Sequence, residues 1–146
     1  MVKSEVQRVN AEAIKHVKSS FARSILNPGF VKRFYQVLFE SYPRIKPMFA
    51  ETDLVRQSEL LKHSITLLIS YANGDVLGES GLKRLRKAHN KKNRNTPPHL
   101  YDYGVTSLIK TVSEFDQQFN STLMNEWREI LFNGIEYIKE GYDLEE

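Results

Sequence analysis

The sequence predicts an all-α protein. Apolar residues recur every three or four positions along almost the whole chain, which is the period of a helix that buries one side. Helix-starting pairs such as Asn27-Pro28 and Thr96-Pro97 divide the chain at regular intervals. No segment alternates apolar and polar residues as a half-buried strand does. We therefore expect six to eight helices.

The first predicted helices follow from local start and stop signals. Ser4 and Gln7 form a capping-box pattern that opens a first helix. Asn27-Pro28 starts a second helix, because Asn caps the end and Pro fits the first turn. That helix ends before Pro43, and an irregular turn is expected from Pro43 to Phe49.

The remaining helices are predicted in the same way. One runs from near Asp53 to about Tyr71, and Asn73-Gly74 then forms a loop because no strands flank it. The next covers Gly81–Asn90, and another begins at Thr96-Pro97 and extends to about Phe119. The apolar stripe of the last helix consists of Met124, Trp127, Leu131, Ile135 and Ile138.

Length and composition fit one domain, residues 1–146. The hydrophobic fraction of 40% and charged fraction of 27% are ordinary for a soluble globular protein. The absence of cysteine excludes a disulfide framework. No signal peptide is recognisable, and the longest apolar stretch is too short to span a membrane. We expect a cytoplasmic protein.

His89 is the first candidate functional residue. It shares a helix face with Leu82 and Leu85, so its side chain is expected to point inward. An inward histidine is more often a hydrogen-bonded core residue than a metal ligand, and spacing alone leaves both interpretations open.

The helix after Asp53 is apolar on two sides. One side consists of Gln57, Leu61, Ser64, Ile65 and Leu68. One polar group at the N-terminal end of a face that is mostly aliphatic beyond it suits the wall of a flat apolar cofactor site. A plain core helix with Gln57 at its solvated end is the alternative.

Three segments resemble bacterial globins, including the globin domain of flavohaemoglobins. The run from Phe34 to Pro43, FYQVLFESYP, and the following KPMF at Lys46 to Phe49 resemble the second helix and its corner. The segment PHLYDYGVTSLI, from Pro98 to Ile109, is similar to the start of the penultimate helix. The resemblance implies a globin fold, with helices packed around haem b.

The resemblance also implies roles for particular residues. His89 matches the proximal histidine that binds iron, and Tyr35 and Gln57 match the distal tyrosine and glutamine. Phe49 and Leu85 match residues that contact haem in the family. Leu61 and Ile65 are included because they share a helix face with Gln57. The expected haem contacts are therefore Phe49, Leu61, Ile65 and Leu85.

The other histidines are weaker candidates. His63 is the rival distal residue, but it lies closer to His89 than family spacing implies and on a different stripe from Gln57. His16 is expected on the surface. His99 is expected at a helix start or near the haem edge.

The resemblance implies reversible binding of O₂, NO and CO. Oxidation of NO would make the protein an NO dioxygenase, but it requires an electron donor. The sequence has no Gly-rich phosphate-binding loop, so a separate reductase would have to supply electrons. A haem-based gas or redox sensor that signals through protein contacts is the main alternative, and a haem-free, globin-shaped interaction module is another.

One departure from flavohaemoglobins affects the chemistry. Their penultimate helix carries a tyrosine and their last helix a glutamate, which together polarise the proximal imidazole. Here Leu100 aligns with the tyrosine, Tyr101 is next to it, and no glutamate is placed. The resemblance therefore implies reversible binding rather than peroxidase-like chemistry.

The positive charge is local, although the net charge is only +3. The cations between positions 83 and 94, with no acid among them, are Lys83, Arg84, Arg86, Lys87, Lys91, Lys92 and Arg94. A solvated helix face, contact with haem propionates and docking of an acidic partner all fit. Nucleic acid is disfavoured because the cluster is short and lacks aromatic residues.

Overall fold

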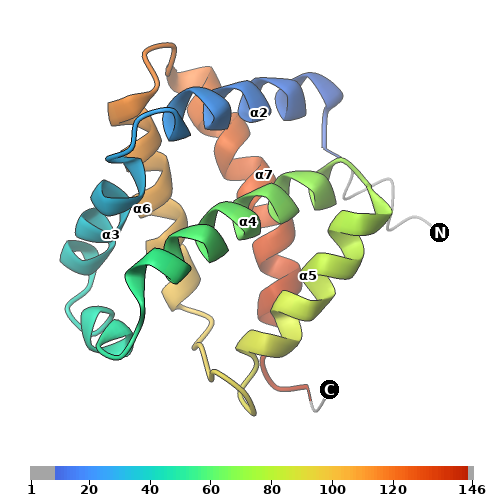
Figure 1. Ribbon diagram of the computed structural model, residues 1–146. Helices are drawn as coiled ribbons and strands as arrows, with labels where there is room; N and C mark the ends of the chain where they lie inside the picture. Colours follow the sequence, from blue (N-terminus) through green and yellow to red (C-terminus); the bar gives the residue numbers. More distant parts are fainter. Residues whose placement is uncertain (1–8, 145–146) are drawn as a thin grey trace.

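The computed structural model describes residues 9–144, and over this range it contains helices and no strand, which confirms the all-α prediction (Figure 1). The capping-box pattern at Ser4 and Gln7 lies outside the described residues. Within that range, no helix is both long and apolar enough to cross a membrane. The elements are α2 (Ala11–Ile25), α3 (Phe30–Ser41), the 3₁₀ helix η1 (Lys46–Phe49), α4 (Leu54–Ala72), α5 (Val76–His89), α6 (Leu100–Phe115) and α7 (Ser121–Glu140).

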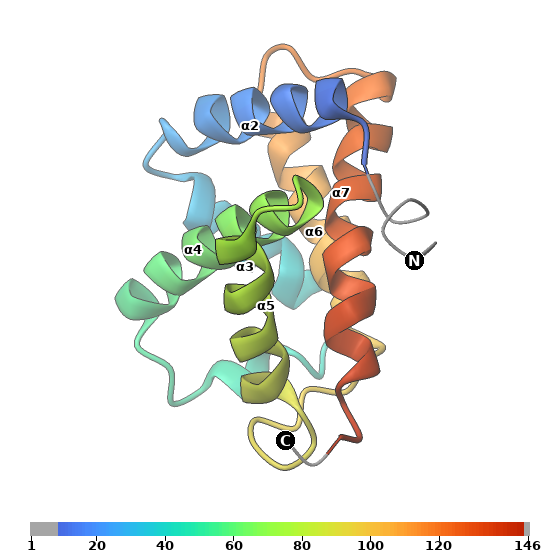
Figure 2. The same ribbon diagram turned by 90° about the vertical axis from the view of Figure 1, so that its right-hand side faces the viewer.

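Most helices pack against more than one other helix. α4 and α5 form an antiparallel pair that lies against α7, while α3 packs on α6 (Figure 1). α2 crosses one end of the molecule, and α7 runs along its length (Figure 2). The turn between α5 and α6 lies beside the chain that leaves α7, at the end of the molecule remote from α2 (Figure 2).

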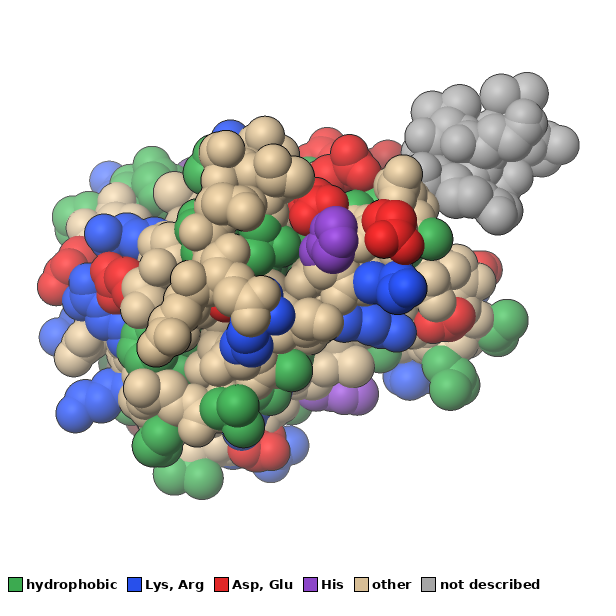
Figure 3. Space-filling model, turned by 90° about the horizontal axis from the view of Figure 1, so that it is seen from above, with side chains coloured by type: hydrophobic (Ala, Val, Ile, Leu, Met, Phe, Trp, Pro, Cys, Tyr) green, Lys and Arg blue, Asp and Glu red, His purple; other side chains and the backbone are tan. Residues whose placement is uncertain are grey.

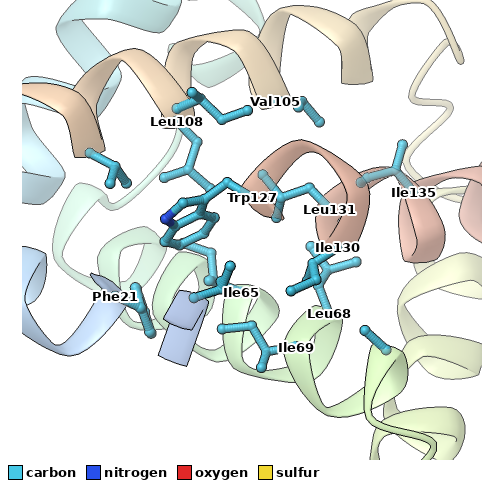
Figure 4. Packing of buried hydrophobic residues seen from close by; sticks show 14 of the residues in the cluster. Phe21, Ile65, Leu68, Ile69, Val105, Leu108, Trp127, Ile130, Leu131 and Ile135 are labelled. Atoms are coloured by element: carbon cyan, nitrogen blue, oxygen red, sulfur yellow. The ribbon is translucent and has the colours of Figure 1, made fainter. Parts of the chain in front are cut away.

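The apolar core lies between α4, α6 and α7. Trp127 is fully buried at the α2 end of this core, where its ring meets Phe21 edge-on at a centroid distance of 6.4 Å (Figure 4). Its indole N–H donates to the hydroxyl of Ser20 at 2.9 Å. That hydroxyl donates to Asp116 at 2.6 Å, so the buried polar atoms of this region have partners.

Asn27 helps to start α3 near the predicted place. Its side-chain oxygen accepts from the backbone N–H of Gly29 at 2.8 Å, and the helix begins at Phe30. The turn predicted as irregular between Pro43 and Phe49 contains η1, whose Pro47 is tolerated in a first turn.

Two predicted boundaries are wrong. α5 begins at Val76 rather than Gly81. Gly78 and Gly81 both lie inside the helix, on the side that faces α4. α6 begins at Leu100 rather than at Thr96, after a turn in which the N–H of Leu100 donates to the Pro97 carbonyl at 3.0 Å.

The end of α6 is also earlier than predicted. The helix stops at Phe115 and not near Phe119, because Asp116 is extended and turns its carboxylate into the protein. There Arg23 donates to the carboxylate at 2.6 and 3.0 Å.

Candidate functional site

A cavity of about 450 Å³ lies between α3, η1 and α4 through α7. Most of its lining is aliphatic or aromatic, which suits a flat apolar molecule. The lining residues are Phe34, Tyr35, Leu38, Ile45, Met48, Phe49, Thr52, Gln57, Leu61, Ser64, Ile65, Leu68, Leu85, His89, Arg94, Thr96, Leu100, Tyr101, Gly104, Val105, Leu108, Leu131, Ile135 and Ile138.

His89 is the last residue of α5 and lines this cavity. Its Nδ1 lies 2.8 Å from the carbonyl oxygen of Leu85, one turn earlier. A carbonyl only accepts, so Nδ1 carries the proton and Nε2 keeps its lone pair. Such an imidazole is a ready metal ligand.

The surroundings of His89 favour its neutral form. Burial lowers the pKa of the imidazole, the Leu85 carbonyl opposes that shift, and the positive charge of Arg94 lowers the pKa further. The net pKa lies below the ordinary value. The ring is therefore neutral at pH 7, which is the protonation state that binds a metal ion.

Tyr35 and Gln57 form a polar pair in an otherwise apolar wall. Tyr35 extends from α3 and is 7% exposed, and its hydroxyl is hydrogen-bonded to the side chain of Gln57 on α4. Burial raises the pKa of Tyr35, and the bond to Gln57 offsets only part of the shift. The phenol therefore remains protonated and can donate a hydrogen bond into the cavity.

The structure brings the predicted haem contacts into the same lining. Phe49 packs against Tyr35 at a ring-centroid distance of 5.7 Å. Leu61 and Ile65 reach the cavity from α4, and Leu85 reaches it from α5 one turn before His89.

The other histidines lie elsewhere. His63 is exposed and is not part of the lining, although it shares α4 with Gln57. The exposed His16 approaches Glu126 within 2.9 Å, on the α2 side of the molecule. His99 directly precedes α6, and its ring lies 6.1 Å from that of Tyr42.

Sequence reasoning assigned no role in the site to Tyr101 and Thr96, which also line the cavity. The ring of Tyr101 lies 6.4 Å from that of His89. Burial raises the pKa of Tyr101, and a hydrogen bond with Thr96 offsets part of that shift. Tyr101 lies at the start of the helix that follows the His89 loop, and this position was a signal of its place in the site. Helical periodicity alone does not distinguish such a residue from a core aromatic.

No carboxylate is among the described residues that line the cavity. Leu100 and Tyr101 both reach it from α6, and α7 contributes only Leu131, Ile135 and Ile138. The His89 imidazole thus has a neutral carbonyl, rather than a charged group, as its acceptor.

The loop after His89 is tied to the chain that follows α7. The backbone N–H of Lys91 donates to the Tyr142 carbonyl at 2.8 Å, and the Tyr142 hydroxyl donates to the Asn95 side chain at 2.5 Å. Asn95 has a positive φ of 54°, which asparagine tolerates better than most residues. The N–H of Thr96 returns to the His89 carbonyl at 3.1 Å, which closes the loop beside the cavity.

Gly104 provides a test of whether a flat cofactor fits. It lies inside α6, where alanine would be favoured by about 1 kcal/mol, yet it carries no side chain. A Cβ built at Gly104 meets no heavy atom within 4 Å, so the glycine leaves open space on the cavity wall. This space and the free Nε2 of His89 fit a planar iron-containing group.

Comparison with solved structures found a close match. The chain is similar to PA3967 from Pseudomonas aeruginosa PAO1, whose crystal structure is described as structurally highly homologous to a human haemoglobin. The two share 32% identity with a TM-score of 0.85, over 89% of this chain and 98% of PA3967. No protein-family model and no curated protein matched the chain.

The chain belongs to the globin family and resembles a globin of bacterial origin. The fold predicted from the sequence is thereby confirmed.

Proposed function

We propose that this globin binds haem b through His89 Nε2 and reversibly binds small gases such as O₂, NO and CO. The observation that carries the proposal is the bond between His89 Nδ1 and the Leu85 carbonyl, 2.8 Å long, which leaves Nε2 as the ring nitrogen able to coordinate a metal. Haem supplies a ferrous iron with one open coordination position, where diatomic gases bind.

Tyr35 would act on the bound gas as a hydrogen-bond donor. Its phenol stays protonated, and a donor stabilises a ligand that acquires negative charge, as O₂ does and CO does not. A hydrogen bond to a charged partner contributes about 1.5–3 kcal/mol. Gln57 would hold the hydroxyl in place through its bond to Tyr35.

Arg94 and Thr96 supply a polar edge suited to the carboxylates of the cofactor. Arg94 is exposed and lines the cavity, so a carboxylate there would meet a guanidinium close to solvent. The remaining wall is mostly aliphatic and aromatic, which suits the apolar part of the ring.

The proximal side favours reversible binding. His89 donates to a neutral carbonyl, and no carboxylate of the described lining increases its basicity. A less basic ligand would donate less electron density to the iron of a bound haem, which would favour reversible gas binding over peroxidase-like chemistry.

Replacement of His89 tests the proposal directly. We expect purified wild-type protein reconstituted with haem to give a strong Soret band. We expect His89→Ala to lose haem to an excess of a haem-binding acceptor protein at least tenfold faster. His63→Ala is the matched control on an exposed histidine and should behave as wild type. Normal haem retention and an unchanged ferrous spectrum in His89→Ala would refute the assignment.

A further inference from the structure

Four exposed cations cover the outer side of α5 and the start of the following loop. We define the cationic surface as Lys83, Arg84, Lys87 and Lys91. The first three lie on the last two turns of α5, and His89, at the end of the same helix, lines the cavity. Arg94 extends the positive charge to the cavity itself.

Within residues 9–144, the positive charges of the cationic surface are not paired with carboxylates, whereas those of several other lysines are. Within residues 9–144, no ion pair joins its members to a carboxylate, and no acid occurs between positions 80 and 101. By contrast, Lys62 and Lys110 lie within 3.1 and 3.6 Å of a glutamate. On the α2 face, basic and acidic side chains are interspersed (Figure 3).

This arrangement has an electrostatic consequence. Four cations that form no ion pair within residues 9–144, on one side of a small protein, create a local positive potential, although the net charge is only +3. Such a potential speeds encounter with an oppositely charged surface by roughly 10- to 1000-fold, and it extends about 10 Å at 0.1 M salt. The surface therefore selects acidic partners and orients them beside the cavity.

We propose that the cationic surface docks an acidic protein that carries single electrons. The inference rests on the proposed function, because reversible O₂ binding needs ferrous iron. These 146 residues contain no Gly-rich nucleotide-binding loop. In the exchange, the reduced carrier gives up one electron and becomes oxidised, while iron(III) in the cavity becomes iron(II). No bond is made or broken and no proton moves.

Other anionic partners fit the surface less well. Single-stranded nucleic acid is usually bound with aromatic side chains among the cations, and the cationic surface has none. A membrane would need apolar side chains at the same place. The exposed Val76 and Leu77 lie at the opposite end of α5 from His89.

A binding experiment with a charge-matched control tests the proposal. The probe is flavodoxin, a small acidic flavoprotein, titrated in its oxidised form into the haem-reconstituted globin by calorimetry at low salt. We expect the combined variant K83E/K87E/K91E to raise the Kd at least tenfold. The control K18E/K32E/R128E changes the net charge equally at exposed positions on α2, α3 and α7, and its Kd should stay within about threefold of wild type.

A kinetic measurement completes the test. Reduction of the ferric protein by reduced flavodoxin should slow steeply with salt in wild type and in the control, and should be slow at every salt concentration in K83E/K87E/K91E. Equal effects of the two variants, or tighter binding of single-stranded DNA or of vesicles rich in anionic lipid than of flavodoxin, would overturn the proposal. Binding of flavodoxin by protein that takes up no haem would refute the proposed function and leave the docking surface standing.

Discussion

At Tyr35, burial and a single hydrogen bond determine the chemistry of the distal side. The residue is 7% exposed and its phenol pKa is raised, so the hydroxyl is a donor over the whole physiological pH range. Its ring packs between Phe34 and Phe49, with centroid distances of 5.0 and 5.7 Å. The hydroxyl is therefore held in position by packing as well as by Gln57.

Replacing Tyr35 by phenylalanine should separate O₂ from CO. We expect O₂ dissociation to accelerate by roughly 10- to 150-fold, the equivalent of a charged hydrogen bond, while CO dissociation changes little. Stopped-flow ligand replacement measures both rates. Tyr103→Phe is the control, because Tyr103 stacks on Tyr42 at 4.7 Å and is not part of the cavity lining. Equal acceleration for both gases would mean that the ring, and not the hydroxyl, is responsible.

The inward orientation of single residues was predicted correctly where the helical period of apolar residues agreed with the residue spacing of the globin family. His89, Gln57 and Leu61 were placed on inward faces, and each lines the cavity. Tyr101 was missed, because its neighbour Leu100 also reaches the cavity and sequence alignment could not choose between adjacent positions. Thr96 was missed because the path of its loop depends on distant contacts such as that of Tyr142 with Asn95.

At the scale of elements, the contact between α4 and α5 positions the helix that ends at His89. Gly78 lies against the backbone of α4, where a Cβ would lie 2.5 Å from the nitrogen of Tyr71 and 2.6 Å from the carbonyl carbon of Ser70. Backbone atoms cannot rotate away as a side chain can. The distance between the two helices, and hence the place of His89, depends on this glycine.

Gly78→Ala should therefore destabilise the protein despite the higher helix propensity of alanine. We expect the free energy of unfolding to fall by about 1–3 kcal/mol, the usual cost of forcing an extra methyl into a packed site. Urea unfolding of the haem-free protein measures it. In Gly104→Ala the added Cβ meets nothing within 4 Å, so this control should gain up to about 1 kcal/mol. Equal stability of the two variants would show that α4 and α5 can separate at little cost.

The same glycines explain why the start of α5 was predicted too late. Glycine is a poor helix former, so the predicted helix began only at Gly81, and the preceding turn with Gly78 was left out of it. Their place is determined by the close approach of α4, which is a tertiary contact with no local signature. The middle of each helix was predictable because the residues that it buries in the fold are apolar and recur every three or four positions in the sequence.

For the molecule as a whole, the buried Asp116 links stability to pH. Burial alone would raise the pKa of its carboxyl, but hydrogen bonds from Arg23, Ser20 and the N–H of Gln118, together with the charge of Arg23, outweigh it. The pKa in the folded protein thus lies below its value of about 3.9 in an unfolded chain. The stabilisation is present above that value and is lost as the pH falls through the folded-state pKa.

We expect Asp116→Ala to lower the free energy of unfolding by about 3 kcal/mol at pH 7, the usual cost of breaking a buried ion pair. The difference from wild type should shrink below pH 4, because Asp116 of the unfolded wild-type chain then binds a proton while Asp116 of the folded protein is still ionised. Chemical unfolding of the haem-free proteins at several pH values measures both effects. Glu114→Ala, which breaks the more exposed pair with Arg33, should cost at most about 1 kcal/mol. A loss for Asp116→Ala that is constant down to pH 2 would contradict the linkage.

The cavity draws its walls from α3 through α7, so no short stretch of the chain contains it. A chain leaves the ribosome N-terminus first, and the helices that carry Tyr35 and Gln57 therefore emerge before the one that carries His89. Leu131, Ile135 and Ile138 close the last wall and emerge later still. A nascent chain that ends before α7 thus has His89 but no enclosed place for a hydrophobic ring, and under the proposed function loading of haem would have to wait until the synthesis of α7 is finished.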